Sequence, residues 1–375
     1  MTPELVISHV SVPLVGVIAC AAPAGSPPVL QFGVRVPGEH AGAPVIRHQR
    51  YAYYLRTAII AACFTASAVL LPRSAPWFLA GAVLLLELAA DLGCFWLARE
   101  RITAVKHAEH WFEGVRQTVV TDTSWRTRPI RFPAAWLVPA VAVAIATGII
   151  GALRYPDLPS HLATTFTASG APGRVVRKSV FSVFAVVAAQ VWVTLLWPGL
   201  LLIIYRSRPD VDASDPAASA GRYRRFLLGY ARALLTLVAL VNVSLLLSAL
   251  RRWQVYRLAG GSAVLPFLPG VAGVLILLAV ALRMGQAGFR LRRTAGGPGP
   301  GAGGPGPGAG AARDDDRFWK GGLIYVNRDD PAIIVGSRFG VGFIFNLGNP
   351  MAWLVCGTIV AVPAGLAVLR AVAGL

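Results

Sequence analysis

Eight apolar stretches, each long enough to cross a bilayer, constrain this chain more than any other feature. They run over Leu5–Ala22, Tyr54–Leu71, Trp77–Leu97, Ala134–Leu153, Val180–Tyr205, Phe226–Leu250, Ala263–Leu282 and Met351–Val372. A bilayer core of about 30 Å needs about 20 mostly apolar residues per helix, because every backbone polar group must find its partner inside the segment. The sequence therefore predicts an all-α polytopic transmembrane bundle of about eight helices, with a small cytoplasmic appendage near the C-terminal end.

The composition agrees with a membrane protein and excludes a water-soluble globule. Only 14% of the 375 residues are charged and the mean hydropathy is +0.61, whereas soluble domains carry roughly a quarter charged residues. The net charge of +18 would suit a nucleic-acid-binding protein. A chain this apolar intersperses its cations among hydrophobic runs instead of presenting a basic face, so we expect a lipid bilayer and not nucleic acid as its partner.

The cations are distributed unevenly between the two sides of the predicted bundle. If the N-terminus lies outside, the inner loops carry 24 Lys and Arg and the outer side carries 9. Cytoplasmic loops are enriched in Lys and Arg, and the anionic inner leaflet attracts them. We therefore predict a multi-pass plasma-membrane protein with both termini extracytoplasmic. The first stretch has Glu4 in place of the basic start of a signal peptide, so we expect it to be a retained helix.

These spans divide the chain into six parts. Residues 1–153 hold four helices with inner loops 23–53 and 98–133, and residues 154–179 form an outer loop. Helices five to seven occupy 180–293, and a Gly/Pro linker follows over 294–313, too poor in apolar side chains to offset its ordering entropy. Residues 314–350 form a small cytoplasmic domain of unknown function, and 351–375 hold the last helix.

Two acidic residues inside the third apolar stretch are the main candidates for a functional site. Glu87 and Asp91 are one helical turn apart and so share one face. Asp91 lies at the inner-leaflet depth of Arg56 and Arg232, and it could pair with either. One interpretation is an ion or proton relay, or a polar transporter site to which Gln190 and Asn242 contribute. The alternative is an interhelical ion pair that fixes packing, with Arg56 and Arg232 also able to snorkel to the interface.

Other chemistry is weakly indicated. His107, His110 and Glu113 have the spacing of one helical face, but an amphipathic helix at the interface, with Trp111 and Phe112 buried, explains them better than a metal. The four cysteines, at positions 20, 63, 94 and 356, lie in apolar stretches without metal-ligand spacing. No catalytic constellation is legible, so we expect no cofactor, no metal and no enzymatic activity. A ligand, either a peptide or an ion, and the oligomeric state stay undetermined.

The C-terminal cytoplasmic segment contains two distinctive strings, DDRFWKGGLIYVNRDDP and RFGVGFIFNLGNP. Glycines that alternate with bulky residues and an Asp-Asp-Pro turn signal predict a small hairpin at the inner interface. Trp319, Tyr325 and Phe343 are placed at headgroup level in this interpretation. The alternative is a domain packed against the protein's own inner loops.

These strings resemble an uncharacterised domain at the C-terminal end of bacterial, notably actinobacterial, multi-span membrane proteins. The residues that carry the resemblance are Phe318, Trp319, Lys320, Asp330, Pro331, Arg338, Phe339, Gly340, Gly342, Asn346, Gly348, Asn349 and Pro350. The string Gln31–Pro37 also looks like the first inner loop of this family. The resemblance implies membership of a family without a known activity.

The outer loop resembles the extracytoplasmic segment that this family shares with SdpI-type immunity proteins. Its matching residues are Pro159, Phe166, Gly170, Pro172, Arg174 and Lys178, whereas Thr165 and Gly173 differ from the family pattern. The resemblance implies a protein that senses or resists membrane-active agents. The alternative is an ion-coupled transporter that uses Glu87 and Asp91.

Overall fold

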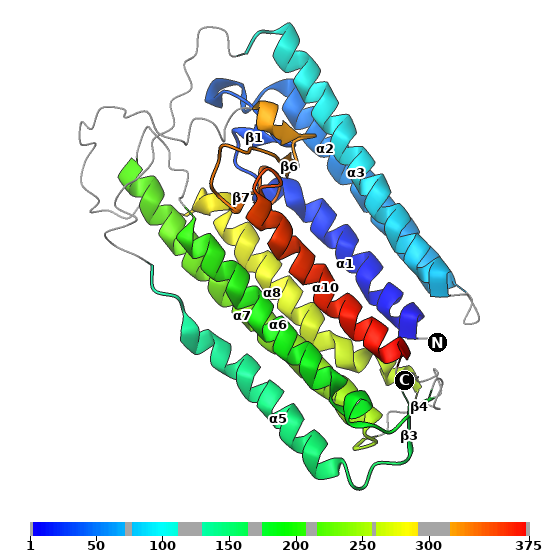
Figure 1. The fold of residues 1–375 in the computed structure, drawn as a ribbon. Helices are drawn as coiled ribbons and strands as arrows, with labels where there is room; N and C mark the ends of the chain where they lie inside the picture. Colours follow the sequence, from blue (N-terminus) through cyan, green and yellow to red (C-terminus); the bar gives the residue numbers. More distant parts are fainter. Residues whose placement is uncertain are drawn as a thin grey trace.

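Eight long helices traverse the molecule in alternating directions (Figure 1). The computed structural model describes residues 3–71, 77–111, 130–163, 175–207, 216–256, 260–291 and 316–372. The long helices are α1 (Pro3–Gly25), α2 (Pro44–Leu70), α3 (Trp77–Ala108), α5 (Val138–Arg154), α6 (Val180–Arg206), α7 (Pro216–Arg252), α8 (Leu268–Met284) and α10 (Pro350–Val372). The predicted all-α bundle with a small C-terminal appendage is confirmed.

Six of these helices are long and apolar enough to cross a membrane. They are α2, α3, α6 and α7, together with α5 and α8, each joined to the short 3-10 helix that precedes it, η2 (Ala134–Leu137) and η3 (Gly260–Phe267). Shorter apolar stretches, His9–Gly25 in α1 and Pro350–Gly365 in α10, run alongside them. Large apolar side chains such as Leu70, Leu85 and Val360 are exposed on the bundle surface. The chain is therefore a multi-pass membrane protein, whose apolar surface faces lipid.

Local sequence explains where several helices begin. Proline stands at the first or second position of α2, α5 and α8, where the missing N–H has no intrahelical partner to lose. At the start of α6, the Ser179 hydroxyl accepts a hydrogen bond from Ser182 N, and the Ser182 hydroxyl accepts one from Ser179 N. This reciprocal capping satisfies two of the N–H groups that a helix start leaves open.

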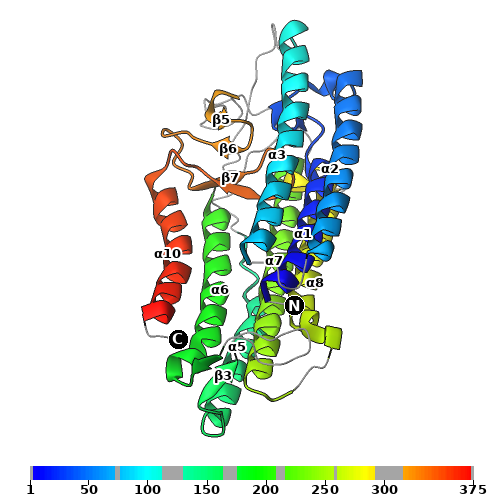
Figure 2. The ribbon, with the colours of Figure 1, turned by 90° about the vertical axis from the view of Figure 1, so that its right-hand side faces the viewer.

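The helices form two groups that meet along α1 and α8. Helix α1 packs against α2 and α3, and α7 packs against α5, α6 and α8. Figure 2 shows α10 beside α6, with most of its surface open. Helix α1 begins and α10 ends at the same end of the bundle (Figures 1 and 2).

Short antiparallel hairpins cover both ends of the bundle. At one end lie β1 (Leu30–Gln31) with β2 (Val34–Arg35), β5 (Trp319–Lys320) with β6 (Ile324–Tyr325), and β7 (Ile334–Gly336) with β8 (Phe343–Phe345). Their registers pair Leu30 with Arg35, Trp319 with Tyr325, and Ile334 with Phe345. At the end where the termini lie, β3 (His161–Ala163) pairs with β4 (Val175–Arg177). We call residues 316–349, which include β5 to β8, the appendage.

Candidate functional site

Glu87 and Asp91, here called the acid pair, lie inside the group α1–α3. Glu87 is fully buried and Asp91 is 7% exposed. Among the described residues, none of their four carboxylate oxygens has a hydrogen-bond partner. An ionised carboxylate at the centre of a membrane helix costs about 2.5–3.5 kcal/mol on insertion scales, and two adjacent ones repel each other. An acid pair without donors must therefore carry a proton or a compensating cation.

Helix α1 closes over the acid pair with a glycine. A Cβ atom on residue 16 would lie 3.2 Å from the Oε1 atom of Glu87. That Cβ atom would also collide with Ala61. Gly16 therefore lets α1, α2 and α3 approach closely at the depth of Glu87.

The hydroxyl groups near the acid pair are already engaged. Tyr53 lies within electrostatic range of Asp91, and its hydroxyl donates to Ala19 O at 3.2 Å. The Thr57 hydroxyl donates to Tyr53 O at 2.9 Å and accepts from Cys20 Sγ at 3.3 Å. A desolvated metal ion would need several oxygen ligands. The two carboxylates, beside hydroxyl groups that are already engaged, therefore suit a proton or a cation that carries apolar substituents.

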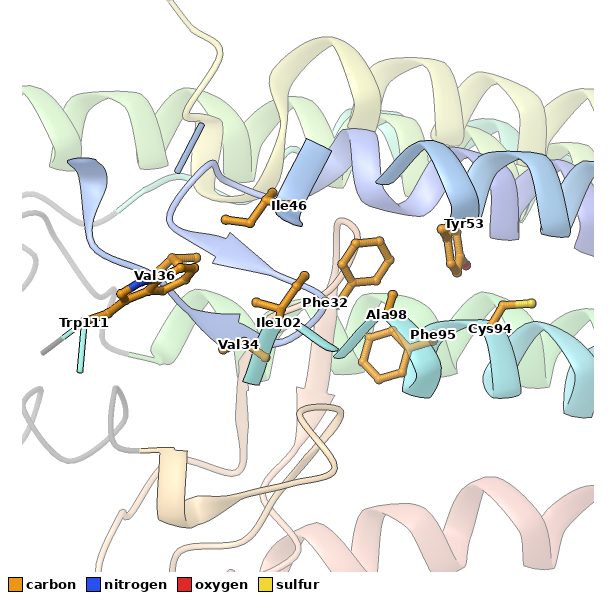
Figure 3. Packing of buried hydrophobic residues seen from close by; sticks show 10 residues of the cluster. All are labelled: Phe32, Val34, Val36, Ile46, Tyr53, Cys94, Phe95, Ala98, Ile102 and Trp111. Atoms are coloured by element: carbon orange, nitrogen blue, oxygen red, sulfur yellow. The ribbon is translucent and has the colours of Figure 1, made fainter. Parts of the chain in front are cut away.

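An aromatic cluster of Phe32, Tyr53, Phe95 and Phe339 covers the acid pair on the side of the appendage. The Phe32 ring lies 5.1 Å from the Tyr53 ring and 5.6 Å from the Phe339 ring, and Phe339 lies 4.7 Å from Phe95. Figure 3 shows Phe32, Phe95 and Tyr53 converging from hairpin β1–β2, α3 and α2. Tyr53 belongs to this cluster and lies on α2, which packs against the helix that carries the acid pair, so it connects α2 and α3 to the appendage.

The turn that carries Phe32 has an unusual backbone. Phe32 and Gly33 have φ angles of 48° and 71°, as the tight two-residue turn of a hairpin requires. A side chain on residue 33 would collide with Gly322, at the tip of the β5–β6 hairpin. The strings QFGVRVP, FWKGG and RFGVGF, far apart in the sequence, therefore meet at one place.

The segment Arg338–Phe343 joins the two helix groups. Gly340 N donates to the Ser26 hydroxyl at 2.9 Å, at the end of α1. Gly342 exchanges two hydrogen bonds with the side chain of Gln286, which follows α8. Phe339 lies in the aromatic cluster, whereas Phe343 packs 5.6 Å from Tyr230 of α7. One short segment thus contacts the acid-pair group and the α7–α8 group at once.

The asparagines of the C-terminal string hold the appendage together. Asn346 is fully buried, donates to the carbonyls of Asn327, Asp330 and Ala332, and accepts from Asn327 N and Gly348 N. A Cβ on Gly348 would overlap the Asn327 backbone. Asn349 Oδ1 accepts from Met351 N, and its Nδ2 donates to Pro331 O, so it caps α10, which begins with Pro350. These residues of the C-terminal string therefore stabilise the fold of the appendage and the start of α10.

Asp316 anchors the start of the appendage to α3. Its carboxylate accepts a hydrogen bond from Lys106 Nζ at 2.7 Å and forms an ion pair with the buried Arg338. Burial raises the pKa of Asp316, but the hydrogen bond from Lys106 and the charge of Arg338 outweigh it, so the pKa lies below its ordinary value. The Arg338 guanidinium also lies 4.5 Å from the centre of the Trp319 ring. Ion pairs therefore hold the appendage to α3, and we call the contact of Asp316 with Lys106 and Arg338 the latch.

Several predicted interface side chains lie inside the protein instead. Trp319 and Tyr325 are buried in the small core of the appendage, with Phe318 beside them, and Phe343 packs against α7. The expectation that Trp319, Tyr325 and Phe343 sit at headgroup level was wrong, because Trp319 and Tyr325 form a small core with Val335, and Phe343 is half-buried against Tyr230 of α7. The predicted hairpin form is confirmed, and Lys320 is exposed at its surface.

The expected pairing of Asp91 with an arginine does not occur. Arg56 is exposed on α2, and Arg232 is exposed on α7 with its guanidinium 6.0 Å from the centre of the Trp136 ring. Their similar depth along the sequence says nothing about which helices are neighbours, and α7 belongs to the other group. The acid pair thus lacks the cation that a purely structural ion pair would require.

Gln190 and Asn242 form a separate polar network instead of contributing to the acid pair. Gln190 Nε2 donates to Thr147 Oγ1 and to Asn242 O, both at 3.0 Å. Asn242 Nδ2 donates to Thr194 Oγ1 at 2.7 Å and to Ala140 O at 3.1 Å. These bonds link α5, α6 and α7 near mid-membrane.

The outer loop is only partly covered by the described residues. Pro159 is exposed before β3, and Lys178 Nζ donates to the carbonyls of Pro156 and Leu158. Lys178 therefore closes the β3–β4 hairpin against the end of α5. Phe166, Gly170, Pro172 and Arg174 lie outside the described residues, as does Glu113 of the histidine-rich stretch.

The histidine-rich stretch does not form one helical face. Helix α3 ends at Ala108, and His110 has a φ of 51°. Trp111 is buried as expected, stacked 4.8 Å from the His40 ring. In the part of the chain that the structure describes, no group of three or more His, Cys, Asp or Glu side chains could hold a metal.

Comparison with known proteins adds no further assignment, since no protein-family model, curated protein or solved structure matches this chain.

Proposed function

We propose that this chain is a non-enzymatic, proton-exchanging membrane protein that uses Glu87 and Asp91 as its working site. The observation that carries this proposal is the burial of four carboxylate oxygens to which no described residue donates a hydrogen bond. Intramembrane carboxylates in that condition are expensive and mark ion or proton pathways. An ion-coupled carrier is the class of protein that such a site supports best.

The orientation belongs to the same proposal. The end that carries hairpins β1–β2, β5–β6 and β7–β8 would be cytoplasmic, because 24 of the 35 Lys and Arg residues lie in the loops assigned to that side. Both termini would then be extracytoplasmic. The exposed cations of the appendage, among them Arg317, Lys320 and Arg328, would meet the anionic inner leaflet of the plasma membrane.

The aromatic cluster supports a coupled site more than an isolated one. Tyr53 lies within electrostatic range of Asp91, and its ring lies 6.1 Å from the Phe339 ring of the appendage. A change in the charge of the acid pair would alter the packing beneath Phe339. We infer that the appendage responds to proton exchange and passes the change to α7 through Phe343.

Infrared difference spectroscopy on the reconstituted full chain tests proton exchange directly. A buried protonated carboxyl group gives a carbonyl stretching band that disappears when the group ionises. We expect such a band to respond to pH in the wild type. It should be absent from the single variant Glu87→Gln or from the double variant Glu87→Gln/Asp91→Asn. Glu100→Gln, an exposed acid on the same helix, is the matched control and should retain the band. A wild-type spectrum without this band would overturn the proposal.

A protective role, which the resemblance to SdpI-type immunity proteins implies, is the physiological side of the proposal. A strain that lacks the protein would then become selectively sensitive to membrane-active peptides or ionophores. The wild-type chain should restore growth, and Glu87→Gln should not. Equal rescue by both forms would separate protection from the acid pair.

A further inference from the structure

An open groove of about 750 Å³ runs between α1 and α2, next to the acid pair. Its walls are small or apolar and include Val17 of α1 and Ala62, Ala66 and Val69 of α2, all of them exposed. This volume lies within the range of sites that take drug-sized molecules, about 300–1,000 Å³. Because both helices belong to the membrane region, the groove opens toward the lipid.

Gly16 connects the groove to the acid pair. It lines the groove and is itself buried, with Glu87 Oε1 3.2 Å from where its Cβ would be. Gly16 and Ala61, which both line the groove, therefore lie between it and a Glu87 carboxylate oxygen. Cys20 also lines the groove and contacts Thr57, one helical turn along α1.

The charge of the site determines which occupant would fit it. No described residue donates a hydrogen bond to the acid pair, and the hydroxyls of Tyr53 and Thr57 already donate to backbone carbonyls. A small hydrated ion would lose its water there and regain few ligands. A cation that carries its own apolar substituents would fill the groove with its body and neutralise a carboxylate with its charge.

We propose that the α1–α2 groove takes up a lipophilic organic monocation from the membrane. Its apolar body would lie between α1 and α2 and its positive centre would reach Glu87. This inference rests on the proposed function, because it makes the cation a competitor of the exchangeable proton. Binding converts the Glu87 carboxyl group to a carboxylate paired with the cation, and the proton passes to the aqueous medium. The approach requires α1 to move away from Ala61 at Gly16.

Tetraphenylphosphonium is a suitable probe, and triphenylphosphine oxide is a neutral aromatic comparison. The full chain in nanodiscs of zwitterionic lipid should bind tetraphenylphosphonium saturably, one per chain, above the level of empty nanodiscs. Binding should release protons into a weakly buffered medium. Glu87→Gln should weaken it at least tenfold. Equal affinity for both probes would identify the groove as an acyl-chain contact and overturn the proposal.

A groove-filling pair of variants separates this inference from the proposed function. Ala66→Phe fills the groove, whereas Ala58→Phe adds the same bulk at an exposed position of α2 away from it. We expect at least a tenfold loss of binding for the first and none for the second, with the infrared carboxyl band intact in both. An intact band with no cation binding in the wild type would overturn the inference alone. A wild-type spectrum without the carboxyl band would overturn the proposed function and this inference together.

Discussion

At the scale of single residues, Asp316 shows how one carboxylate can secure a small domain. Lys106 and Arg338 approach it from α3 and from the β7–β8 connection, and Arg338 is almost completely buried. Hydrogen bonds to charged groups contribute more than neutral ones, and removal of one partner leaves the other charge uncompensated. The docking of the appendage therefore depends on the ionisation of this side chain.

Because the pKa of Asp316 is lowered in the folded protein, its contribution to docking is present above the ordinary Asp range, about 3.9, and is lost as the pH falls through the folded value. We predict that Asp316→Asn accelerates amide hydrogen exchange in residues 316–349 at neutral pH and flattens its dependence on acid, after correction for intrinsic rates. Asp329→Asn, at an exposed position of the same domain, should change neither. Unchanged protection in Asp316→Asn would show that the latch is dispensable.

At the scale of elements, α5, α6 and α7 are joined by polar side chains where apolar packing alone would not specify their register. Gln190 and Asn242 are fully buried and donate across two helix interfaces. Lipid tails are as apolar as leucine, so such hydrogen bonds and close packing must supply much of the association between helices. Polar residues of this kind act as helix-to-helix contacts and need no ligand.

Gln190→Leu should lower the free energy of unfolding in mixed micelles by about 1 kcal/mol, since interhelical hydrogen bonds in membranes contribute about 0.6–1.7 kcal/mol. Part of the loss is offset, because Gln190 Oε1 is buried without a donor and its removal relieves a desolvation cost. Val191→Leu, at the neighbouring position that faces lipid, should have no measurable effect. A variant at Gln190 as stable as the wild type would mean that packing alone holds α5 to α6.

At the scale of the whole molecule, the two ends of the bundle differ. One end carries the appendage and hairpin β1–β2, and the other carries hairpin β3–β4 and both ends of the helical chain (Figures 1 and 2). Exposed positions on each end, Ser160 beside β3 and Lys320 in β5, can report which side of the membrane each end occupies.

A cysteine at each position, in a chain without the four native cysteines, tests the orientation. In intact cells, a membrane-impermeant maleimide should label Ser160→Cys at least tenfold more than Lys320→Cys. After permeabilisation both should react. The reverse pattern would invert the proposed topology while it leaves the fold unchanged.

The sequence predicted where the helices lie along the chain far better than it predicted which helices are neighbours. Hydrophobic length located a helix at each of the eight apolar stretches, because backbone satisfaction in lipid leaves no other solution. The ends agree to within five residues, except that α2 and α7 each begin ten residues earlier than predicted and α3 ends eleven residues later. The sequence could not show that Asp91 has no partner among the described residues, because depth along a helix does not say which side chains lie opposite. Likewise, Trp319 and Phe343 are residue types common at membrane interfaces, and only the structure shows that Trp319 lies in the core of the appendage and that Phe343 packs against α7. Gly16 gave no signal at all, since its role depends on Ala61 and Glu87 from two other helices.

The hydrogen bond between Ser26 and Gly340 closes a loop of 314 residues, and this has a consequence for biogenesis. At about 5–20 residues per second, the ribosome needs roughly 15 to 60 s to deliver Phe339 after α1 has emerged. During that time Phe32, Tyr53 and Phe95 of the nascent chain lack the Phe339 ring that contacts them in the finished molecule. A polypeptide interrupted anywhere before the appendage never gains that ring. Coverage of these three aromatic side chains therefore distinguishes a finished molecule from a fragment.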